Sequence, residues 1–325
     1  MKKTQVDTNP YEYSDTNKRY QTYDYYLKHT FGGKCMKIPL DAGFTCPNID
    51  GKCSVGGCIY CSDRGSGDFA PQSTTPVDEQ FELVKAQLSS KWKTDKYIPY
   101  FQAHTNTYAP TEVIKSKIEP IMKKDGVVAL NIATRADCLE DDTLSYLAEL
   151  AERTVLTVEL GLQTSNDETA RIINRGHTFQ DFVEGYKKLR AVSQEINVCI
   201  HIIFGLPGES REDMLKTVRD VAELEPEQVK IHLLHVIRGT RLSDMYISGE
   251  YQPLTKDEYV SVTAEALTLL PPQTVIGRLT GDGMQSELLA PDWSRKKTIV
   301  INDIDKLMYD RDIWQGKNYS KKKQD

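Results

Sequence analysis

The sequence alternates near-continuous apolar runs with stretches of helical periodicity, and this rhythm limits the chain to a small set of folds. Four apolar runs cover residues 127–134, 154–164, 196–207 and 229–237. Such runs are typical of strands that are buried on both faces of a sheet. Between them, apolar side chains recur at helical spacing, as at Phe81, Val84 and Leu88. Because this β, α order repeats from residue 36 to about 270, parallel strands joined by right-handed helical crossovers are expected.

The number of repeats bears on the architecture within the α/β class. We count about six β/α units, fewer than the eight of a closed TIM barrel. A partial barrel and an open doubly wound sheet both agree with this count, and periodicity alone does not choose between them. Helix starts are predicted at the capping residues Thr111, Asp141, Thr178 and Ser210.

The flanks of this pattern differ from its centre and suggest three segments. Residues 1–35 are polar and rich in tyrosine, and we interpret them as a lead-in that packs on the surface of the core. Residues 36–270 form the predicted core domain. Residues 271–325 form a C-terminal extension, with a strand-like segment VIGRLTG near its start and a basic tail, KNYSKKKQD, at its end.

Composition excludes several classes of protein. The chain has 325 residues, 39% of them hydrophobic, and carries 41 Lys+Arg against 47 Asp+Glu; disordered, collagenous and disulfide-framed small proteins are excluded. A net charge of −6 does not indicate nucleic-acid binding by the chain as a whole. No apolar run approaches the roughly 20 residues of a membrane span, and the N-terminus lacks a secretory signal pattern. We therefore expect a cytoplasmic protein with no membrane association.

Four cysteines crowd into the loop after the first predicted strand. They are Cys46, Cys53, Cys58 and Cys61, and thiolates at this density suit a zinc ion or an iron–sulfur cluster. A structural zinc site normally has two close cysteine pairs, whereas this loop has one C-x-x-C. The loop also lies where α/β enzymes place their active sites, which favours a cluster. The remaining thiols lie in or beside apolar stretches and are predicted to be buried packing residues: Cys35, Cys138 and Cys199.

The spacing of these cysteines resembles that of a known family. Cys46 is followed after eleven residues by the C-I-Y-C segment that ends at Cys61, which is similar to the cluster loop of the radical S-adenosylmethionine (radical SAM) superfamily. The similarity is narrower to its YtqA/YhcC-like (MnmL-type) branch, related to the Elongator catalytic subunit and to coproporphyrinogen dehydrogenase. It runs from KHTFGGKCMKIPLDAGFTCPNIDG to LTGDG and LLAPDWSRKK, although the spacing departs from the common C-x3-C-x2-C.

The resemblance implies a fold and a cofactor. The fold would be a partial, TIM-like (β/α)6 barrel with N- and C-terminal extensions. A 4Fe-4S cluster would be held by Cys46, Cys58 and Cys61, with Tyr60 beside it, and Cys53 is an extra thiol of unassigned role. Three protein ligands would leave one iron open, as a catalytic zinc keeps an open position.

The same resemblance implies a site for S-adenosylmethionine at the strand ends. The second strand lacks the family's Gly-Gly-Glu-like motif and ends instead with Gln102, Thr105 and Asn106, while Arg135 follows the third strand. Gln163 matches the position that bonds the ribose, and Arg175 the cation that meets the methionine carboxylate. From strand alternation alone, Glu159 shares a face with Gly161 and Gln163 and needs a buried partner. A structural ion pair remains an alternative for Glu159 and for Arg135. His104 and His232 are further polar residues near strand ends, without assigned roles.

The implied activity is cleavage of S-adenosylmethionine to a 5'-deoxyadenosyl radical, with electrons from an external donor such as flavodoxin or ferredoxin. The branch points to tRNA as the substrate, at the step from carboxymethylaminomethyl to aminomethyl on the wobble uridine. A basic C-terminal segment with aromatic residues agrees with RNA binding: SRKK at 294–297, KKK at 321–323, Trp293, Trp314 and Tyr319. A radical enzyme on a small molecule such as a tetrapyrrole, and a non-catalytic cluster or zinc protein, remain alternatives.

Overall fold

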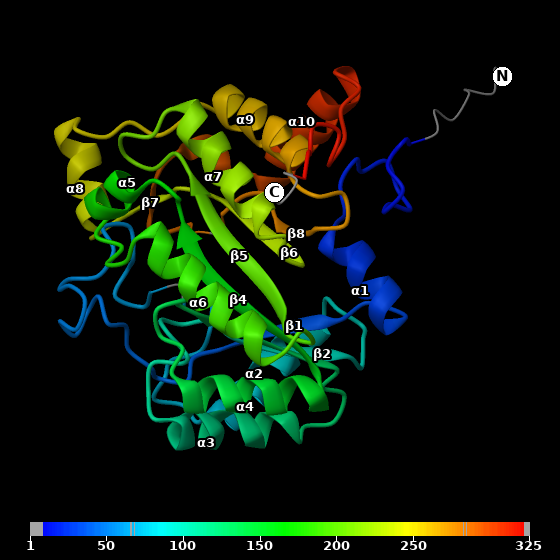
Figure 1. Cartoon of the computed structure of the whole chain (residues 1–325), viewed down its shortest axis with the longest axis vertical. Helices are drawn as coiled ribbons and strands as arrows, with labels where there is room; N and C mark the ends of the chain where they lie inside the picture. Colours follow the sequence, from blue (N-terminus) through cyan, green and yellow to red (C-terminus); the bar gives the residue numbers. More distant parts are fainter. Residues whose placement is uncertain (1–8, 66, 68, 282, 284, 322–325) are drawn as a thin grey trace.

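The protein is built on one parallel β-sheet that curls into a half-barrel. A computed structural model describes residues 9–321 apart from 66, 68, 282 and 284, and Figure 1 shows its elements. Within these residues the sheet has seven strands, and every neighbouring pair is parallel. In spatial order the strands are β1 (Met36–Leu40), β2 (Tyr97–Phe101), β3 (Ala129–Thr134), β4 (Val155–Gln163), β5 (Asn197–Phe204), β6 (Gln228–Leu233) and β8 (Val275–Arg278).

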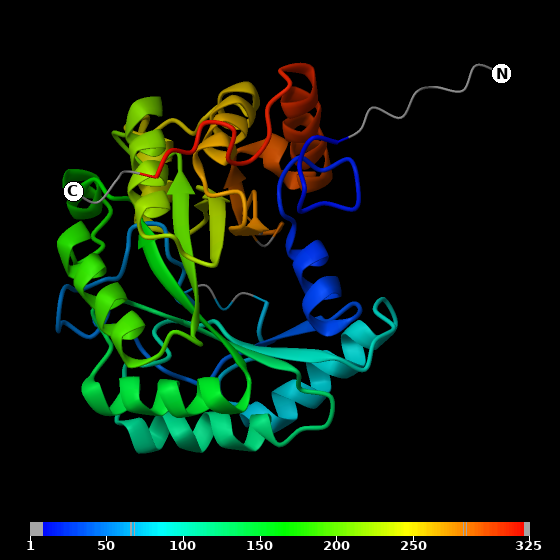
Figure 2. The ribbon, with the colours of Figure 1, turned by 45° about the vertical axis from the view of Figure 1, so that its right-hand side comes forward.

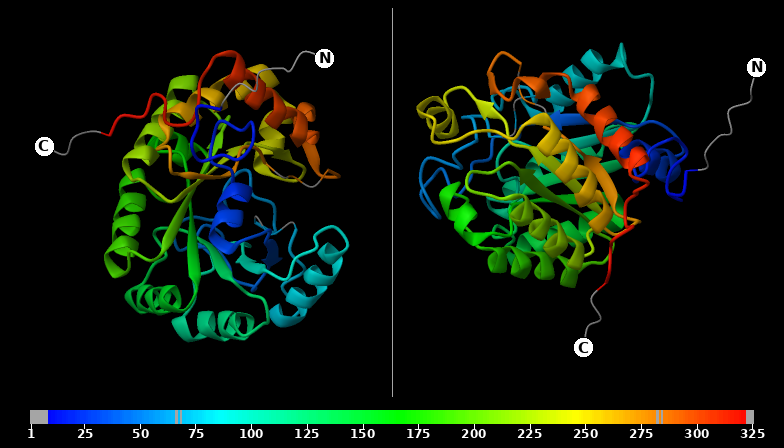
Figure 3. Two further views of the ribbon diagram at one scale, coloured as in Figure 1. Left: turned by 90° about the vertical axis from the view of Figure 1, so that its right-hand side faces the viewer. Right: turned by 90° about the horizontal axis from the view of Figure 1, so that it is seen from above.

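Helices follow the strands and surround the outside of the curl (Figure 3, left). The fold is therefore the partial barrel rather than the doubly wound sheet, with one parallel strand more than the six predicted units. That strand, β8, lies in the strand-like segment after residue 270. The helices are α1 (Tyr23–Phe31), α2 (Val77–Ser89), α3 (Thr111–Met122), α4 (Asp141–Arg153), α5 (Asp167–Ile172), α6 (Phe179–Val192), α7 (Arg211–Glu223), α8 (Arg241–Ser248), α9 (Lys256–Leu269) and α10 (Lys297–Asp310).

The main core lies between the strands and these helices. Its fully buried side chains come from both layers, for example Leu156 of β4, Phe182 of α6 and Val218 of α7. A second apolar cluster lies beside the cysteine loop and joins Ile59 to Ile173 and Leu242. Because Ile59 stands between Cys58 and Tyr60, burial of its side chain fixes the C-x-x-C turn against the rest of the protein.

The lead-in closes the open side of the half-barrel. Thr22 forms a parallel bridge with Ile276 of β8, and the amide of Ile276 donates to the carbonyl of Gln21 over 2.8 Å. Helix α1 follows directly and lies between the last strands and β1 (Figures 2 and 3). The first and last strands of the sheet are thus separated by a segment that belongs to neither.

The C-terminal extension contributes β9 (Leu288–Ala290), which pairs antiparallel with β7 (Val236–Ile237) of the core, and a short 3-10 helix, Asp292–Arg295. Its aromatic residues are not the exposed stacking surface that the sequence suggested. Trp293 packs on Tyr259 with ring centroids 5.7 Å apart and donates to the carbonyl of Leu254. Tyr319 is half-buried against the core. Of the predicted KKK run, only Lys321 lies among the described residues, and it pairs with Glu225 over 2.8 Å.

Candidate active site

A cavity of about 300 Å³ opens inside the curl, at the carboxyl ends of the strands. The cysteine loop after β1 forms one wall, and strand ends from β2 to β8 form the others. The structure brings nine of the ten predicted site residues to this cavity: Cys46, Cys58, Tyr60, Cys61, Gln102, Arg135, Glu159, Gln163 and Arg175. His104, Thr105 and His232, which the sequence also singled out, line it as well.

Asn106 is the predicted site residue that does not reach the cavity wall. Its side chain is 1% exposed, and its Nδ2 donates to the carbonyls of Phe101, Ala103 and Ala133 over 2.9–3.2 Å. The amide of Asn106 therefore shapes the turn that follows β2, and its donor group is already occupied by the backbone.

The three predicted metal ligands share one wall of the cavity. All seven cysteines of the chain are free thiols, and a tight turn brings the amide of Cys61 to the carbonyl of Cys58 over 3.0 Å. A hydrogen bond from the Cys61 thiol and the nearby charge of Arg175 outweigh burial, so that the pKa of the Cys58 thiol lies well below its ordinary value. The same hydrogen bond and burial raise the pKa of the Cys61 thiol well above its ordinary value, so Cys58 is the thiolate of this pair and Cys61 is its proton donor.

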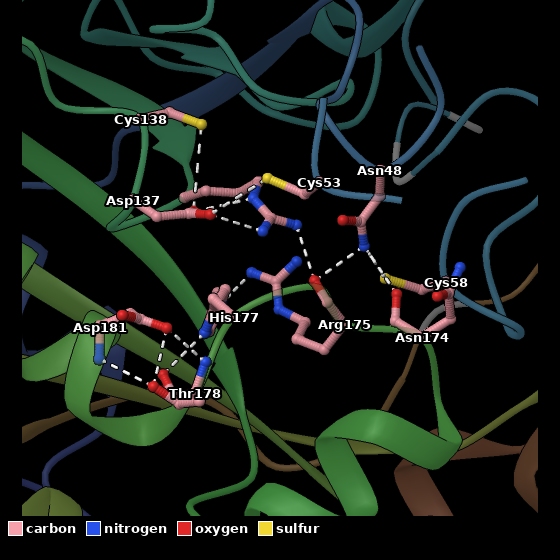
Figure 4. Close-up of polar contacts among 12 residues, drawn as sticks. Asn48, Cys53, Cys58, Asp137, Cys138, Asn174, Arg175, His177, Thr178 and Asp181 are labelled. Atoms are coloured by element: carbon pink, nitrogen blue, oxygen red, sulfur yellow. Dashed lines mark hydrogen bonds and ion pairs between the residues drawn. The ribbon is translucent and has the colours of Figure 1, made fainter. Parts of the chain in front are cut away.

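Cys53 lies apart from this wall. Its thiol is exposed, and Sγ is 3.9 Å from Oδ2 of Asp137 (Figure 4). The predicted packing cysteines Cys35, Cys138 and Cys199 are buried. The structure thus groups Cys46, Cys58 and Cys61 and leaves Cys53 outside the group.

Two arginines lie beside the thiols, and they differ in how many of their N–H groups already have hydrogen-bond partners. Arg135 forms a two-pronged ion pair with Asp137, at 2.9 Å and 2.7 Å, and donates to the carbonyl of Arg175 over 2.9 Å. Arg175 donates to the carbonyl of Gly161, and its Nε is buried without a partner among the described residues. A buried donor without a partner is costly, so Arg175 is the cation of this pair that is suited to an anionic ligand.

Gly161 makes room for this arrangement. A Cβ at this position would lie 2.8 Å from Nε2 of Gln163 and 3.1 Å from Nη2 of Arg175. The strand register shifts between Gly161 and Gln163, and Gln163 adopts φ +78°. The irregular end of β4 therefore brings Gln163 and Arg175 to the same place.

A charged network lies deeper in the cavity, centred on Glu159. The carboxylate is fully buried and accepts from Lys37 over 2.9 Å, from Asn131 over 2.8 Å, from Nε2 of His201 over 2.8 Å and from Lys230. Burial opposes its ionisation, but the charges of Lys230 and Lys37 outweigh burial and hold the pKa of Glu159 well below its ordinary value. Burial also lowers the pKa of His201 to about 4 and that of Lys230 to about 8.

These contacts answer the expectation that Glu159 has a partner. Its lone pairs are taken by four donors from β1, β3, β5 and β6, which is the pattern of a structural ion-pair network. Lys37 and Lys230 were not predicted as site residues. The sequence did contain a signal for both, since a lysine inside an otherwise apolar buried strand requires a buried partner.

Comparison with known proteins identifies the family. The model of the radical SAM superfamily matches residues 49–221, and that of the radical SAM C-terminal domain matches residues 226–310. The chain belongs to the radical SAM superfamily and is a radical SAM enzyme.

Its relatives include two full-length matches. The chain is 47% identical to YtqA of Bacillus subtilis over 316 residues, 97% of this chain and 98% of YtqA. It is 31% identical to YhcC of Escherichia coli K12 over 288 residues, 88% of this chain and 91% of YhcC. These matches confirm the predicted branch.

A third match is partial. The tRNA uridine(34) acetyltransferase of Methanocaldococcus jannaschii is 30% identical over 158 residues, 48% of this chain and 28% of that protein. Among solved structures, the archaeal Methanocaldococcus infernus Elp3 with an N-terminal deletion superposes with a TM-score of 0.63 at 21% identity, over 86% of this chain and 64% of that chain. This last likeness confirms the fold.

Radical SAM enzymes use a 4Fe-4S cluster and S-adenosylmethionine, and the cavity fits both. Three thiols lie on one wall, and thiolate sulfur is a soft ligand that would suit the iron of such a cluster. The buried, unpartnered Nε of Arg175 beside them supplies a cation for a carboxylate. Over the described part of the chain, no helix combines the length and apolarity needed to cross a bilayer.

Proposed function

We propose that this enzyme modifies the wobble uridine of tRNA, converting a carboxymethylaminomethyl group to an aminomethyl group. The 5'-deoxyadenosyl radical would take a hydrogen atom from the carbon between the nitrogen and the carboxylate, and loss of a proton and of one electron, returned to the cluster, would give an imine. Water would then hydrolyse the imine and release the two-carbon unit as glyoxylate, with S-adenosylmethionine consumed as the oxidant. The observation that supports tRNA as the substrate is the relationship to tRNA uridine(34) acetyltransferase, a protein whose name assigns it to uridine 34 of tRNA. The matching region covers about half of this chain and about a quarter of that protein, so the relationship extends to only a part of the acetyltransferase.

In this proposal Cys46, Cys58 and Cys61 hold the cluster, and Arg175 and Gln163 hold S-adenosylmethionine. When bound, the cluster supplies the electron that cleaves S-adenosylmethionine to methionine and a 5'-deoxyadenosyl radical. Arg175 orients the methionine carboxylate through charge-assisted hydrogen bonds. Tyr60 lines the cavity between Cys58 and Cys61 and narrows the access of water to the thiols.

The far side of the cavity is suited to an anionic group of the substrate. Arg278 of β8 lines it together with His232, whose Nε2 is buried without a partner among the described residues. Lys230 of β6 also lines it, but its ammonium is paired with Glu159. A carboxymethylaminomethyl group carries one carboxylate and one amine, so positive charge and an imidazole nitrogen on this wall match both ends of it. The electron donor is proposed to be an external one-electron carrier such as flavodoxin or ferredoxin.

A small-molecule substrate with carboxylates, such as a tetrapyrrole, is the second candidate, because the same positive charges would also attract it. The two candidates differ in what accumulates when the enzyme is absent. Only the tRNA proposal predicts a change in modified nucleosides.

The test is nucleoside mass spectrometry of total tRNA from an organism carrying the gene, with and without a deletion. We expect carboxymethylaminomethyl-uridine species to accumulate in the deletion strain. Wild type and Cys53→Ala should restore the profile, and Cys58→Ala should not, because Cys58 is assigned to the cluster and Cys53 is not. An unchanged profile in the deletion strain would refute the tRNA substrate.

A second assay tests the radical chemistry separately. Anaerobically reconstituted protein with dithionite should form 5'-deoxyadenosine from S-adenosylmethionine, and Cys58→Ala should form none. Formation of 5'-deoxyadenosine without any tRNA phenotype would direct the search to small molecules.

A further inference from the structure

Two asparagines tie the cysteine loop to the turn that carries Arg175. Asn48 lies two residues after Cys46 and is 1% exposed. Its Nδ2 donates to the carbonyls of Asn174 and Arg175, each over 2.7 Å (Figure 4). The side chain of one loop thus binds the backbone of the other.

The side chain of Asn174, in turn, binds the backbone of the cysteine loop. Its Nδ2 donates to the carbonyls of Val55 and Gly57 over 3.1 Å and 2.7 Å, and its Oδ1 accepts from the hydroxyl of Ser54 over 2.6 Å. We call Asn48 and Asn174 together the asparagine clamp. Because each asparagine holds the backbone of the other's segment, the positions of the thiols and of Arg175 are coupled.

The backbone of the turn is adapted to the clamp. Gly176 has φ +78°, and a Cβ on it would lie 2.2 Å from Oδ1 of Asn48. Asn174 has φ +56°, a left-handed conformation that asparagine tolerates better than most residues. Glycine at position 176 is therefore required for Asn48 to occupy its place.

Asn48 makes one contact that Asn174 does not. Its Nδ2 lies 3.5 Å from Sγ of Cys58 and donates to it. The two N–H groups of the amide are thus shared among two carbonyl oxygens and one sulfur. The opposite orientation of the amide would place its oxygen against both carbonyls, so these acceptors fix the direction of the N–H groups.

A hydrogen bond to a ligand sulfur matters for a redox cluster. Reduction places negative charge on the cluster and its thiolates, and a donor to sulfur stabilises the reduced form more than the oxidised form. Such a bond therefore raises the reduction potential. Asn48 supplies this donor from a side chain, so substitution can remove it while the loop backbone remains.

We propose that Asn48 is a positioning residue that raises the reduction potential of the cluster through Cys58 and holds Arg175 at a fixed distance from it. The clamp therefore couples binding of the methionine carboxylate at Arg175 to the redox properties of the cluster. The inference rests on the proposed assignment of Cys58 as an iron ligand, and it is independent of the tRNA substrate.

The experiment compares Asn48→Ala with the matched control Asn174→Gly. Both variants loosen the clamp, and glycine accepts the left-handed backbone at position 174, but only Asn48→Ala removes the donor to Cys58. Midpoint potentials are measured on reconstituted protein by redox titration followed by EPR. Hydrogen–deuterium exchange of the protein without cofactors reports the coupling of the loops.

We expect both variants to increase exchange in residues 55–59 and 173–176, and only Asn48→Ala to lower the midpoint potential. Adding S-adenosylmethionine should change the EPR signal less in Asn48→Ala than in wild type. Equal potentials in wild type and Asn48→Ala would overturn the inference, and so would an equal loss in both variants, since loop mobility alone would then explain the effect.

Two further variants keep the test decisive. If Asn48→Ala does not retain iron, Gly176→Ala displaces the Asn48 side chain without removing it, and an unchanged potential in that variant refutes the role of Asn48. Cys58→Ala tests the premise that Cys58 is an iron ligand. Full iron content in Cys58→Ala would refute that assignment and with it the inference. Loss of iron would support the assignment, and the potentials of the Asn48 variants would then decide the inference.

Discussion

Substitution of Glu159 by glutamine is expected to destabilise the protein even without any cofactor. The change keeps the size of the side chain but removes the negative charge that balances Lys230 and Lys37. The side chains of these lysines are 7% and 27% exposed, respectively. Lys230 would therefore remain buried with no counter-charge from Glu159, whereas Lys37 can turn partly toward water.

The size of the effect follows from this burial. Removing one partner of a buried ion pair typically costs about 3–5 kcal/mol. Because Lys37 is partly exposed, we expect the lower end, about 3 kcal/mol. For a domain of this length, that corresponds to a fall in melting temperature of about 4–6 °C.

The assay is thermal unfolding of the protein without cofactors, followed by circular dichroism. Glu159→Gln is compared with Lys230→Met and with the double variant. Because replacing both partners of a buried pair is often nearly neutral, the double variant should be more stable than the sum of the single effects implies. A melting temperature of Glu159→Gln within about 1 °C of wild type, or strictly additive effects in the double variant, would refute the reasoning.

Two other predictions concern the core around the site. Burial raises the pKa of Glu209, whose carboxylate accepts from Thr164, to about 7; the folded protein therefore keeps a proton that the unfolded chain releases above pH about 4.5. Stability should fall as the pH rises from about 4.5 to 7, and melting temperatures of Glu209→Gln should fall less over this range than those of wild type. Gly185→Ala would place a Cβ 2.0 Å from the carbonyl oxygen of Ala136. We therefore expect the free energy of unfolding, measured by urea titration, to fall by about 2–3 kcal/mol. A fall below about 0.5 kcal/mol would contradict this and show that α6 can move away from the loop after β3 at little cost.

Local patterns in the sequence predicted the starts of four helices, and they placed the first residue of each of these helices to within one residue. Thr178 and Ser210 do cap their helices, each with a capping box. Thr111 and Asp141 are instead the first helical residues, because the extended residue before each of them, Pro110 and Glu140, takes the capping position. A shift of one residue at a helix end is within what local preferences can specify.

In the candidate site, too, local patterns predicted some features, whereas contacts between distant strands could not be predicted. Alternation along β4 placed Glu159, Gly161 and Gln163 on one face, and all three line the cavity. The sequence could not show that Lys37 of β1 reaches across to a carboxylate on β4, because that contact depends on how far the sheet curls. The prediction that Trp293 is exposed was wrong for the same reason. Its ring packs on Tyr259 of α9, which is a tertiary contact that local sequence does not reveal.

The way in which the lead-in closes the half-barrel bears on how the chain folds as it is synthesised. The backbone amide of Gln21 bonds the side chain of Gln315, which lies 294 residues further along the chain. Thr22 likewise pairs with Ile276 of the last strand. Parallel strands β1 to β6 can assemble one after another as they leave the ribosome, because each pairs with its predecessor in the chain. The lead-in is made long before these partners, so closure of the half-barrel is expected to be a late event that follows synthesis of Ile276 and Gln315.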